Sequence, residues 1–569
     1  MSLAAAHAAM TAPGTPFEME EREVHGVRLR VWKHGPQTLR DVFIAGREHA
    51  GKTFLVYENE RATFEAFSRA TLAVADVLAA DGVGRGDRVA IAMRNVPEWP
   101  VAFFATLLLG AIAVPLNAWW THAELEYGLV DSGARFAIVD AERFARVAPS
   151  WPRCPMLERI VVSRLASAPA DPRVRRLEDL IGAVDAWGAL PDRPVPEVAI
   201  EPDDDATIFY TSGTTGHPKG ALGTHRNAVT CVIASGFSVA RAYVRRGEPL
   251  PKPEDRVRQR ASILGVPFFH VTGCFAVLCP SLFNGSKIVS MRRWDTEGAM
   301  ALIEREQCTG AGGVPTLAWQ LLEHPAREKY DLSSLETIAY GGAPAAGELV
   351  RRIRQLVPHS VPGTGWGMTE TTATFTHQSA EEYEQHADGA GPALPVCDMM
   401  IVGDDGRELP RGAVGELLAK GPNVVRGYWR KPEATAETFV DGWVRTGDLA
   451  RIDDEGFLTI VDRKKDMLIR GGENIYCVEV EQALFAHPAV MDAGVIGLPH
   501  RILGEEPVAV VTVKPGAETS EAELRAFVSG RLAAYKVPVR IVLLRDTLPR
   551  NANGKIMKKA LRPLFGDAA

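Results

Sequence analysis

Residues Tyr210 to Gly220 read YTSGTTGHPKG and hold two pairs of hydroxyl side chains, three glycines, a proline and a lysine. The preceding residues 207–210 (TIFY) are typical of a buried strand, and an apolar, helix-like run resumes at Asn227. Glycines let backbone N–H groups approach an anion, hydroxyls donate to it and a lysine neutralises it, so the stretch predicts a phosphate-binding loop between a strand and a helix. The alternative is a flexible surface turn, which rarely carries so many donors.

This loop differs from the best-known phosphate-binding pattern, GxxxxGK[ST]. Lys219 is preceded by Pro218 and followed by Gly220, so neither the glycine nor the hydroxyl of that pattern is in place. The sequence therefore predicts phosphate chemistry of another class.

The length, net charge and cysteine pattern of the chain limit its domain organisation and its partners. At 569 residues it is too long for one hydrophobic core, so more than one domain is expected. A formal net charge of −7 gives no general attraction to nucleic acid, so none is expected as a partner. The seven cysteines are scattered without a CxxC pair, which is typical of reduced thiols in a cytosolic protein and argues against structural zinc.

Two apolar stretches, residues 1–24 and Val101 to Leu116, predict neither a targeting segment nor a membrane segment. Residues 1–24 have no Lys or Arg before Arg22, so we expect a loose arm rather than a signal peptide. The longest apolar run, Val101 to Leu116, is interrupted by Gly110 and Pro115 and is shorter than the roughly 20 residues that a spanning helix needs. We therefore expect no membrane span and a cytoplasmic location. The sequence does not specify the oligomeric state, and a homodimer is one of the states we consider.

Strand-like and helix-like segments alternate from about residue 27 to 200 and again from 262 onward. Residues 64–80 have helical spacing, for example, and residues 88–93 then read as a strand. Such alternation predicts an α/β fold with mainly parallel sheets flanked by helices. Residues 165–205 and 241–260 are rich in proline and charge and are expected to be surface connections.

The last hundred residues predict a separate α+β unit. A helix is expected at about 478–487, strands near 490–498, 508–513 and 541–544, and a second helix from Ser520 with Glu523 completing a capping box. The charged join at 461–467, VDRKKDM, is typical of an exposed hinge. We therefore predict a large N-terminal α/β domain, 1–464, and a small mobile C-terminal α+β domain, 465–569.

Two more motifs carry groups that suit a nucleotide. Residues 363–370 read GTGWGMTE, which offers a ring for adenine, a hydroxyl for a phosphate oxygen and a carboxylate for Mg²⁺. Residues 443–448 read WVRTGD, which ends in a carboxylate that could accept two ribose hydroxyls. Taken alone, Trp366 could be a core residue, Glu370 a surface charge and Asp448 part of a turn.

Five motifs follow one another along the chain: YTSGTTGHPKG, GWGMTE, RTGDL, DRKKDMLIRGGENI and LPRNANGK. In this order they closely resemble the ANL superfamily of adenylate-forming enzymes, which includes acyl- and aryl-CoA synthetases, nonribosomal adenylation domains and luciferases. The resemblance covers roughly residues 40 to 565. It implies a two-step reaction in which a carboxylate and ATP form an acyl adenylate and pyrophosphate, and a thiol, usually that of CoA, then displaces AMP.

The resemblance also implies roles for the nucleotide-binding residues. The first loop would hold the β- and γ-phosphates, Trp366 would flank adenine in place of the more usual Tyr, Thr369 would touch the α-phosphate and Glu370 would bind Mg²⁺. Asp448 and Arg463 would take the ribose hydroxyls. The loop residues concerned are Thr211, Ser212, Gly213, Thr214, Thr215, Gly216 and Lys219.

The family's C-terminal domain swings between the two half-reactions. Lys555 matches the family's adenylation lysine, which bridges the acid carboxylate and the α-phosphate, where a cation lowers the repulsion of two anions in the transition state. Lys465 takes the hinge position. His270 would gate the acid site, and the alternative is a histidine of the core. After the swing, the pantetheine tunnel for CoA would be lined by Gly471, Gly472 and Glu473.

The expected acid pocket is apolar and glycine-rich, with no acidic residue to hold an amino group. It would draw on Val314, Gly341, Gly342 and Met368. Our first hypothesis is therefore a carboxylic acid–CoA ligase for a medium- to long-chain fatty acid or an aryl acid, using ATP, Mg²⁺ and CoA. The second is an acyl-AMP ligase that charges a carrier protein. The third is a nucleotide-binding regulator without catalysis.

Overall fold

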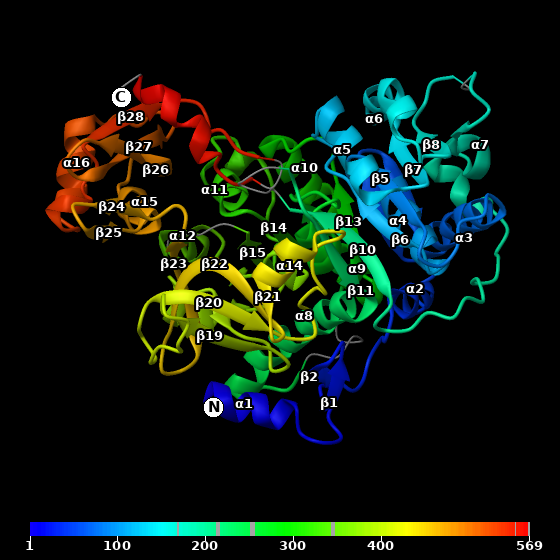
Figure 1. Ribbon diagram of the computed structural model, residues 1–569, viewed down its shortest axis with the longest axis horizontal. Helices are drawn as coiled ribbons and strands as arrows, with labels where there is room; N and C mark the ends of the chain where they lie inside the picture. The colour runs from blue at the N-terminus through cyan, green and yellow to red at the C-terminus, as the bar shows by residue number, and fades with distance from the viewer. Residues whose placement is uncertain (168–169, 212–216, 251–256, 343–346, 552–553, 567–569) are drawn as a thin grey trace.

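The computed structural model describes residues 1–569 except 168–169, 212–216, 251–256, 343–346, 552–553 and 567–569. Its described strands form four large sheets and one small hairpin (Figure 1). The hairpin pairs β1 (Met19–Val24) with β2 (Val27–Trp32), and helix α1 (Leu3–Met10) precedes it. The expected loose arm is therefore wrong for these residues, because Leu3, Ala6 and Met10 bury one face of α1.

The first large sheet has the strand order β11-β10-β6-β5-β7-β8-β9, and only β11 runs antiparallel to its neighbour. Side chains alternate across it: Val89 and Ile91 enter one core, whereas Ala90 and Ala92 enter another. Both faces are buried, as parallel sheets require. The strands are β5 (Arg88–Ala92), β6 (Ile112–Pro115), β7 (Phe136–Asp140), β8 (Arg159–Ser163), β9 (Val174–Arg176), β10 (Asp205–Tyr210) and β11 (Gly220–Thr224).

Helices cover both faces of this sheet. The largest core lies where α2, α3, α4, α8 and α9 pack between the first and the second sheet, and α5 and α6 lie on the opposite face. These helices are α2 (Leu39–Arg47), α3 (Phe64–Ala80), α4 (Glu98–Leu108), α5 (His122–Ser132), α6 (Ala141–Val147), α7 (Leu177–Ile181), α8 (His225–Arg246) and α9 (Cys279–Asn284).

The second sheet has the order β17-β16-β15-β14-β12-β13-β3-β4, with antiparallel strands only at its two edges. Helices α10 (Thr296–Glu306), α11 (Pro315–Glu323) and α12 (Gly347–Leu356) pack on it. Its strands are β3 (Thr53–Tyr57), β4 (Glu60–Thr63), β12 (Ala261–Leu264), β13 (Lys287–Ser290), β14 (Gly310–Gly313), β15 (Thr337–Gly341), β16 (Val361–Gly365) and β17 (Gln378–Ser379).

The third sheet is antiparallel throughout and was not predicted from the alternation. Short turns such as the one at residues 453–456 join neighbouring strands, so no crossover helix is needed. Its elements are β18 (Gly391–Pro392), β19 (Asp398–Val402), β20 (Gly415–Lys420), β21 (Phe439–Val440), β22 (Trp443–Ile452) and β23 (Phe457–Arg463), with α13 (Glu381–Gln385) and α14 (Pro432–Thr438) in the same part of the chain.

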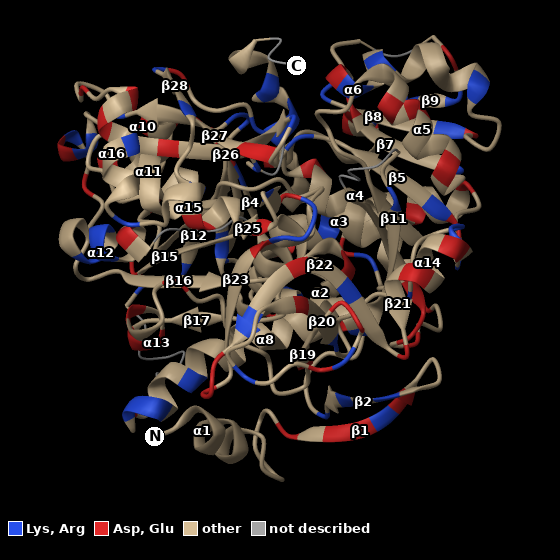
Figure 2. Ribbon diagram, turned by 60° about the vertical axis from the view of Figure 1, so that its left-hand side comes forward, with Lys and Arg blue, Asp and Glu red and all other residues tan. Residues whose placement is uncertain are grey.

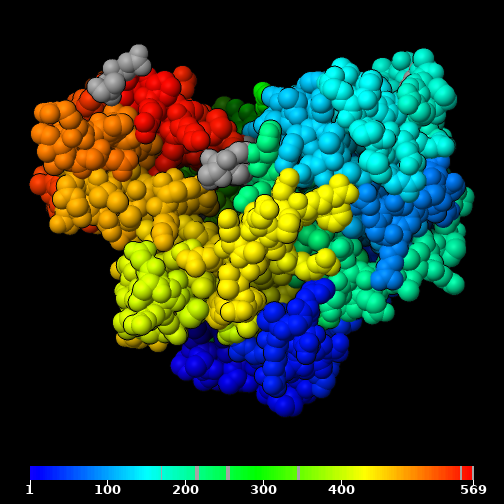
Figure 3. Space-filling model, in the orientation of Figure 1, coloured from blue at the N-terminus to red at the C-terminus, as the bar shows by residue number. Residues whose placement is uncertain are grey.

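The C-terminal unit has a sheet of its own, as the α+β prediction required. Strands β24 to β28 supply all of it, and α15 and α16 pack on its face. Its elements are β24 (Leu468–Arg470), β25 (Glu473–Ile475), α15 (Cys477–Phe485), β26 (Val490–His500), β27 (Gly504–Val513), α16 (Glu521–Ser529) and β28 (Arg540–Leu544). Figure 3 shows this unit, orange and red, lying against the yellow segment, with a hollow between it and the cyan part of the chain.

Three local predictions need correction. Residues 241–246 continue helix α8 rather than belonging to a surface loop, and residues 174–181 form β9 and α7 within the expected connection. Ser520 caps α16 by accepting from the Glu523 N–H, but the Glu523 carboxylate accepts from the Thr519 hydroxyl, so the reciprocal half of the capping box is replaced.

One described helix, α8, is long and apolar enough to cross a membrane, but 61% of its most apolar window is buried inside the protein. Burial of this kind is also found in the core helices of globular folds, so the expected absence of a span remains a prediction. Figure 2 shows the positions of Lys and Arg and those of Asp and Glu interspersed along the ribbon, in line with the modest net charge.

Candidate active site

The predicted phosphate loop joins two strands rather than a strand and a helix. After β10, the chain returns as the antiparallel strand β11, with Tyr210 paired with Gly220, and α8 begins only at His225. The Thr211 N–H donates to the Lys219 carbonyl at 2.9 Å and closes the base of the loop. Ser212, Gly213, Thr214, Thr215 and Gly216 lie outside the described residues, so their phosphate contacts remain predictions.

Three of the predicted nucleotide-site residues meet where strands β22 and β23 of the third sheet pair. Asp448 on β22 pairs in register with Arg463 on β23, and the Arg463 Nε lies 3.4 Å from its carboxylate. The Trp366 Nε1–H donates to the other Asp448 oxygen at 2.8 Å. Tryptophan at this position therefore lacks the hydroxyl of tyrosine but supplies a donor of its own to the carboxylate that we expect to bind ribose.

Glu370 is buried in the short helical turn Thr369–Thr371, directly after Met368. Burial raises the pKa of its carboxyl, and the Tyr428 hydroxyl, which donates to Oε1 at 2.7 Å, opposes that rise, as do the charges of Arg463 and Lys219. Sequence reasoning missed Tyr428. Its segment, RGYWRKPE, reads only as a charged turn, and no spacing marks the tyrosine as a partner of Glu370.

Glycines form the end of the second sheet where the acid pocket was predicted. A Cβ at Gly312 would lie 2.8 Å from the Ala339 carbonyl oxygen, and Gly342 has a φ of +75°, so side chains are excluded at this edge. Val314 follows β14, Gly341 ends β15, and Met368 follows β16. Because these parallel strands end side by side, the four predicted pocket residues lie on one edge of the sheet.

The C-terminal unit brings Lys555 to this edge. A Cβ on Gly554 would lie 2.6 Å from the Val314 side chain, so the Lys555 loop touches the predicted acid pocket. Burial, followed by the positive charges of Arg463 and Lys465, lowers the pKa of Lys555 to about 7, against the opposing charges of Asp448 and Asp466. Lys555 is therefore close to the nucleotide residues as well as to the pocket.

His270 follows β12 and is mostly buried. Its Nδ1 accepts from the Thr272 N–H at 3.3 Å, which leaves Nε2 as the protonated nitrogen of the neutral ring. Burial lowers its pKa to about 4, so the imidazole is uncharged at neutral pH. An uncharged ring is compatible with the predicted gate, and the position of His270 beside the acid remains a prediction.

The predicted CoA-tunnel residues are not gathered at this site. Gly471, Gly472 and Glu473 are exposed on the hairpin of β24 and β25, and the Gly471 N–H donates to the Leu503 carbonyl within the C-terminal unit. Lys465 lies in the turn between β23 and β24, where burial lowers its pKa. The tunnel and hinge roles remain predictions, as does the domain boundary at 464/465.

The predicted Mg²⁺ site depends on which donor groups the structure contains. Among the described residues no group of three or more His, Cys, Asp or Glu side chains could hold a metal. Mg²⁺ at nucleotide sites is often held by one or two carboxylates together with substrate phosphates and water. The single buried carboxylate of Glu370, beside Lys219, fits that pattern.

Two family profiles and several known proteins match this chain. The profile of the AMP-binding enzyme family matches residues 43–429, and that of the AMP-binding enzyme C-terminal domain matches 479–555. Feruloyl-CoA synthase of an Amycolatopsis species is 35% identical, covering 89% of this chain and 94% of its own. Long-chain-fatty-acid–CoA ligase FadD13 of Mycobacterium tuberculosis is 34% identical, covering 86% and 90%. The crystal structure of the anthranilate CoA ligase AuaEII with anthranoyl-AMP has a TM-score of 0.80 and 26% identity, covering 93% of this chain and 97% of that one.

Proposed function

The chain belongs to the AMP-binding enzyme family and is an AMP-forming acid–thiol ligase that works through an acyl adenylate, and from this premise we propose that it joins an apolar carboxylic acid to CoA. The observation that supports the proposal is the contact of the Gly554–Lys555 loop with Val314, together with the electrostatic influence of Arg463 and Asp448 on Lys555. An amine carried by the C-terminal unit would then be available where an acid and an α-phosphate have to be brought together.

The proposed reaction consists of two displacements, in which first pyrophosphate and then AMP is the leaving group. An oxygen of the acid carboxylate bonds to the α-phosphorus of ATP, and the bond to the β,γ-diphosphate breaks, so pyrophosphate leaves. The CoA sulfur, once deprotonated, then bonds to the acyl carbon, and AMP leaves with the electron pair of the broken C–O bond. Lys555, as a cation between carboxylate and α-phosphate, would stabilise the first transition state, while Asp448 and Arg463 would hold the ribose.

Glu370 is the residue that would hold Mg²⁺, and the ion would neutralise phosphate charge during the first displacement. Lys219 and the hydroxyl-rich loop would retain the β- and γ-phosphates as pyrophosphate departs. Thr369, one residue before Glu370, would contact the α-phosphate.

The acid is proposed to be a medium- to long-chain fatty acid or an aryl acid. The glycines at this sheet edge present no side chains to an acid, and the similar proteins named for their acids fall into the same two classes, feruloyl and long-chain fatty acid. A cytoplasmic location is also proposed, supported by seven free and buried cysteines.

A panel of fatty and aryl acids tests the function. We expect acid-dependent exchange of pyrophosphate into ATP, AMP release that requires CoA, and an acyl-CoA product for at least one acid. The variant Lys555→Ala should lose about 10³-fold of the exchange rate, which corresponds to about 4 kcal/mol, yet still convert supplied acyl-AMP and CoA. Exchange without any CoA-dependent AMP release would contradict CoA as the acceptor and favour a carrier protein.

A further inference from the structure

Tyr428 touches two of the site's charged groups at once, and none of the roles described above uses it. Its hydroxyl donates to the Glu370 carboxylate at 2.7 Å. The ammonium of Lys219 lies 4.9 Å from the centroid of the same ring. The tyrosine therefore joins the phosphate loop to the carboxylate that we expect to hold Mg²⁺.

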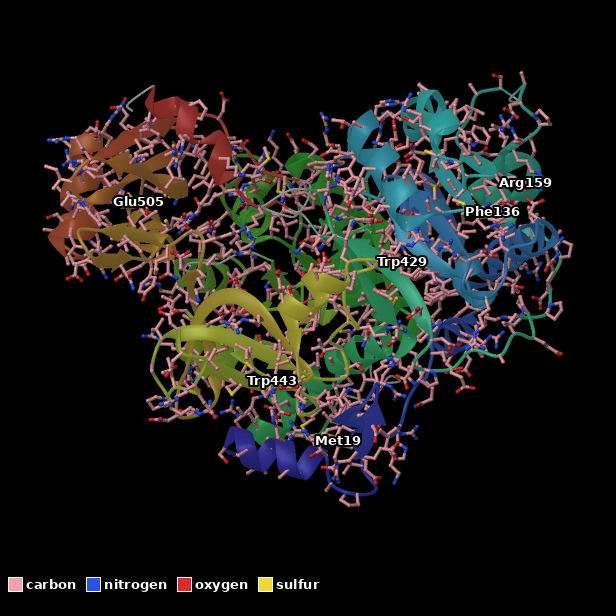
Figure 4. All side chains as sticks on the ribbon, viewed as in Figure 1. Met19, Phe136, Arg159, Trp429, Trp443 and Glu505 are labelled. Atoms are coloured by element: carbon pink, nitrogen blue, oxygen red, sulfur yellow. The ribbon has the colours of Figure 1, made fainter. Side chains whose placement is uncertain are left out.

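The backbone around Tyr428 is fixed to both partners. Tyr428 forms a bridge with Ala221 on β11, and the next residue, Trp429, donates its N–H to the Gly220 carbonyl at 2.7 Å. Trp429 is labelled in Figure 4 and marks the place of this segment beside β11. On the other side, the Val425 N–H donates to the Glu370 carbonyl at 2.9 Å. These bonds hold the ring in register with the loop and with Glu370.

The side chain of Tyr428 is also confined. Its ring packs edge-on against Phe439, with centroids 5.5 Å apart, and its own N–H donates to the Thr435 hydroxyl at 2.9 Å. The phenol hydroxyl has one hydrogen to donate, and it donates it to Glu370. A fixed donor selects one orientation of the carboxylate.

Both contacts are of kinds that stabilise charged groups. A buried carboxylate without a partner is unfavourable, and a hydrogen bond to a charged group is stronger than one between neutral groups. A cation over an aromatic face is attracted by the ring, more strongly when it is desolvated. Without nucleotide, Tyr428 therefore stabilises both charged groups near the positions where they are needed.

We propose that Tyr428 is a positioning residue of the nucleotide site: its hydroxyl aims Glu370 at the metal, and its ring holds Lys219 beside the site for the β- and γ-phosphates. This inference rests on the proposed function for the identity of the nucleotide. It adds a residue that orders the metal and phosphate ligands before ATP arrives.

Two variants separate the two contacts. Tyr428→Phe removes the hydroxyl and keeps the ring, whereas Tyr428→Leu removes both. The probes are AMP and a non-hydrolysable ATP analogue, titrated calorimetrically with excess EDTA or with Mg²⁺, without acid or CoA. The matched control is Tyr243→Phe, which removes a hydroxyl from a ring on α8 that also lies next to a cation, with the Arg246 guanidinium 4.6 Å from its centroid.

For Tyr428→Phe we expect the Mg²⁺-dependent gain in analogue affinity to fall about tenfold, while binding of the metal-free analogue and of AMP stays within about twofold of the unaltered protein. For Tyr428→Leu, binding of the metal-free analogue should fall as well. The control should match the unaltered protein throughout.

Two results would overturn the inference. Equal losses for AMP and for the analogue would show a general structural role, and an unchanged Mg²⁺ dependence in Tyr428→Phe would show that the hydroxyl does not aim Glu370. If instead the unaltered protein binds the analogue with the expected Mg²⁺ dependence but activates no acid, the proposed function fails while this inference stands.

Discussion

At the scale of single residues, the site places its cations before its anions arrive. Lys555 is partly buried near Arg463 and Lys465, and two carboxylates only partly offset that positive charge. This is why its pKa falls to about 7 although a free lysine is protonated up to about pH 10. A triphosphate and an acid carboxylate would supply the missing negative charge and raise the pKa of Lys555 again.

This charge balance predicts a pH effect with a definite sign. Adenylation needs protonated Lys555, so kcat/KM for ATP, which reports the free enzyme, should fall as pH rises through about 7. The kcat of adenylation, which reports the bound complex, should hold to higher pH. Pyrophosphate exchange measured from pH 6 to 9 gives both profiles.

The control for this prediction is Lys555→Arg. A guanidinium stays protonated throughout that range, so its kcat/KM should be lower but should not fall above pH 7. A flat profile for the unaltered protein, or the same fall in the arginine variant, would mean that Lys555 is not the group that titrates.

At the scale of elements, periodic apolar patterns predict helices and strands from the sequence. Elements that depend on contacts with distant parts of the chain are missed. Residues 64–80 were expected to be helical and form α3 with those bounds, because apolar side chains at helical spacing suffice to define it. The antiparallel third sheet and helix α1 were missed, since short strands and an alanine-rich terminus carry weak local signals and are stabilised by packing.

The same difference separates the site residues that sequence motifs predict from those that they miss. Motifs of glycine, hydroxyl and charged residues predict Glu370 and Asp448 as nucleotide ligands, because their chemistry restricts the residue types, and the family resemblance adds Arg463 and Lys555. Tyr428 could not be found in this way, because a tyrosine suits a turn as well as a site. Only the folded chain brings it to a residue 58 positions away.

The loop that carries Lys555 gives a prediction at this scale. Gly554 has a φ of +72° and its missing Cβ would lie 2.6 Å from Val314, so Gly554→Ala should both strain the loop and push it from the acid pocket. We expect adenylation to fall about 10- to 100-fold, equivalent to about 1.4–2.7 kcal/mol, while thioester formation from supplied acyl-AMP is retained. Single-turnover assays of each half-reaction measure this.

Gly516→Ala provides the matched control within the same C-terminal unit. Its φ of +75° imposes the same backbone strain, but a Cβ there would meet no atom within 4 Å. Equal effects of the two substitutions would mean that backbone strain, rather than contact with the acid pocket, explains the loss.

At the scale of the whole molecule, the two parts of the chain meet in an arrangement that suits the first half-reaction. Lys555 is at the nucleotide site, whereas the predicted CoA residues 471–473 are exposed. Among the contacts between the two parts, Lys514 lies over the Trp319 ring at 5.5 Å, and the Cys477 N–H donates to Asp462 across the join. A second arrangement would require these contacts to break and the turn at Lys465 to rotate.

The substitution Lys465→Pro tests that rotation. Proline fixes its own φ near −65° and restricts Lys464 before it, so the turn between β23 and β24 loses the freedom that a swing needs. Adenylation should stay within a few-fold of the unaltered rate, and thioester formation should fall at least about 100-fold, or about 2.7 kcal/mol. Lys465→Ala removes the same side chain but leaves the backbone free, so it should retain both steps. Equal loss of both half-reactions in the proline variant would place the pivot elsewhere, and a matching loss in the alanine variant would assign the effect to the charge of Lys465 beside Lys555.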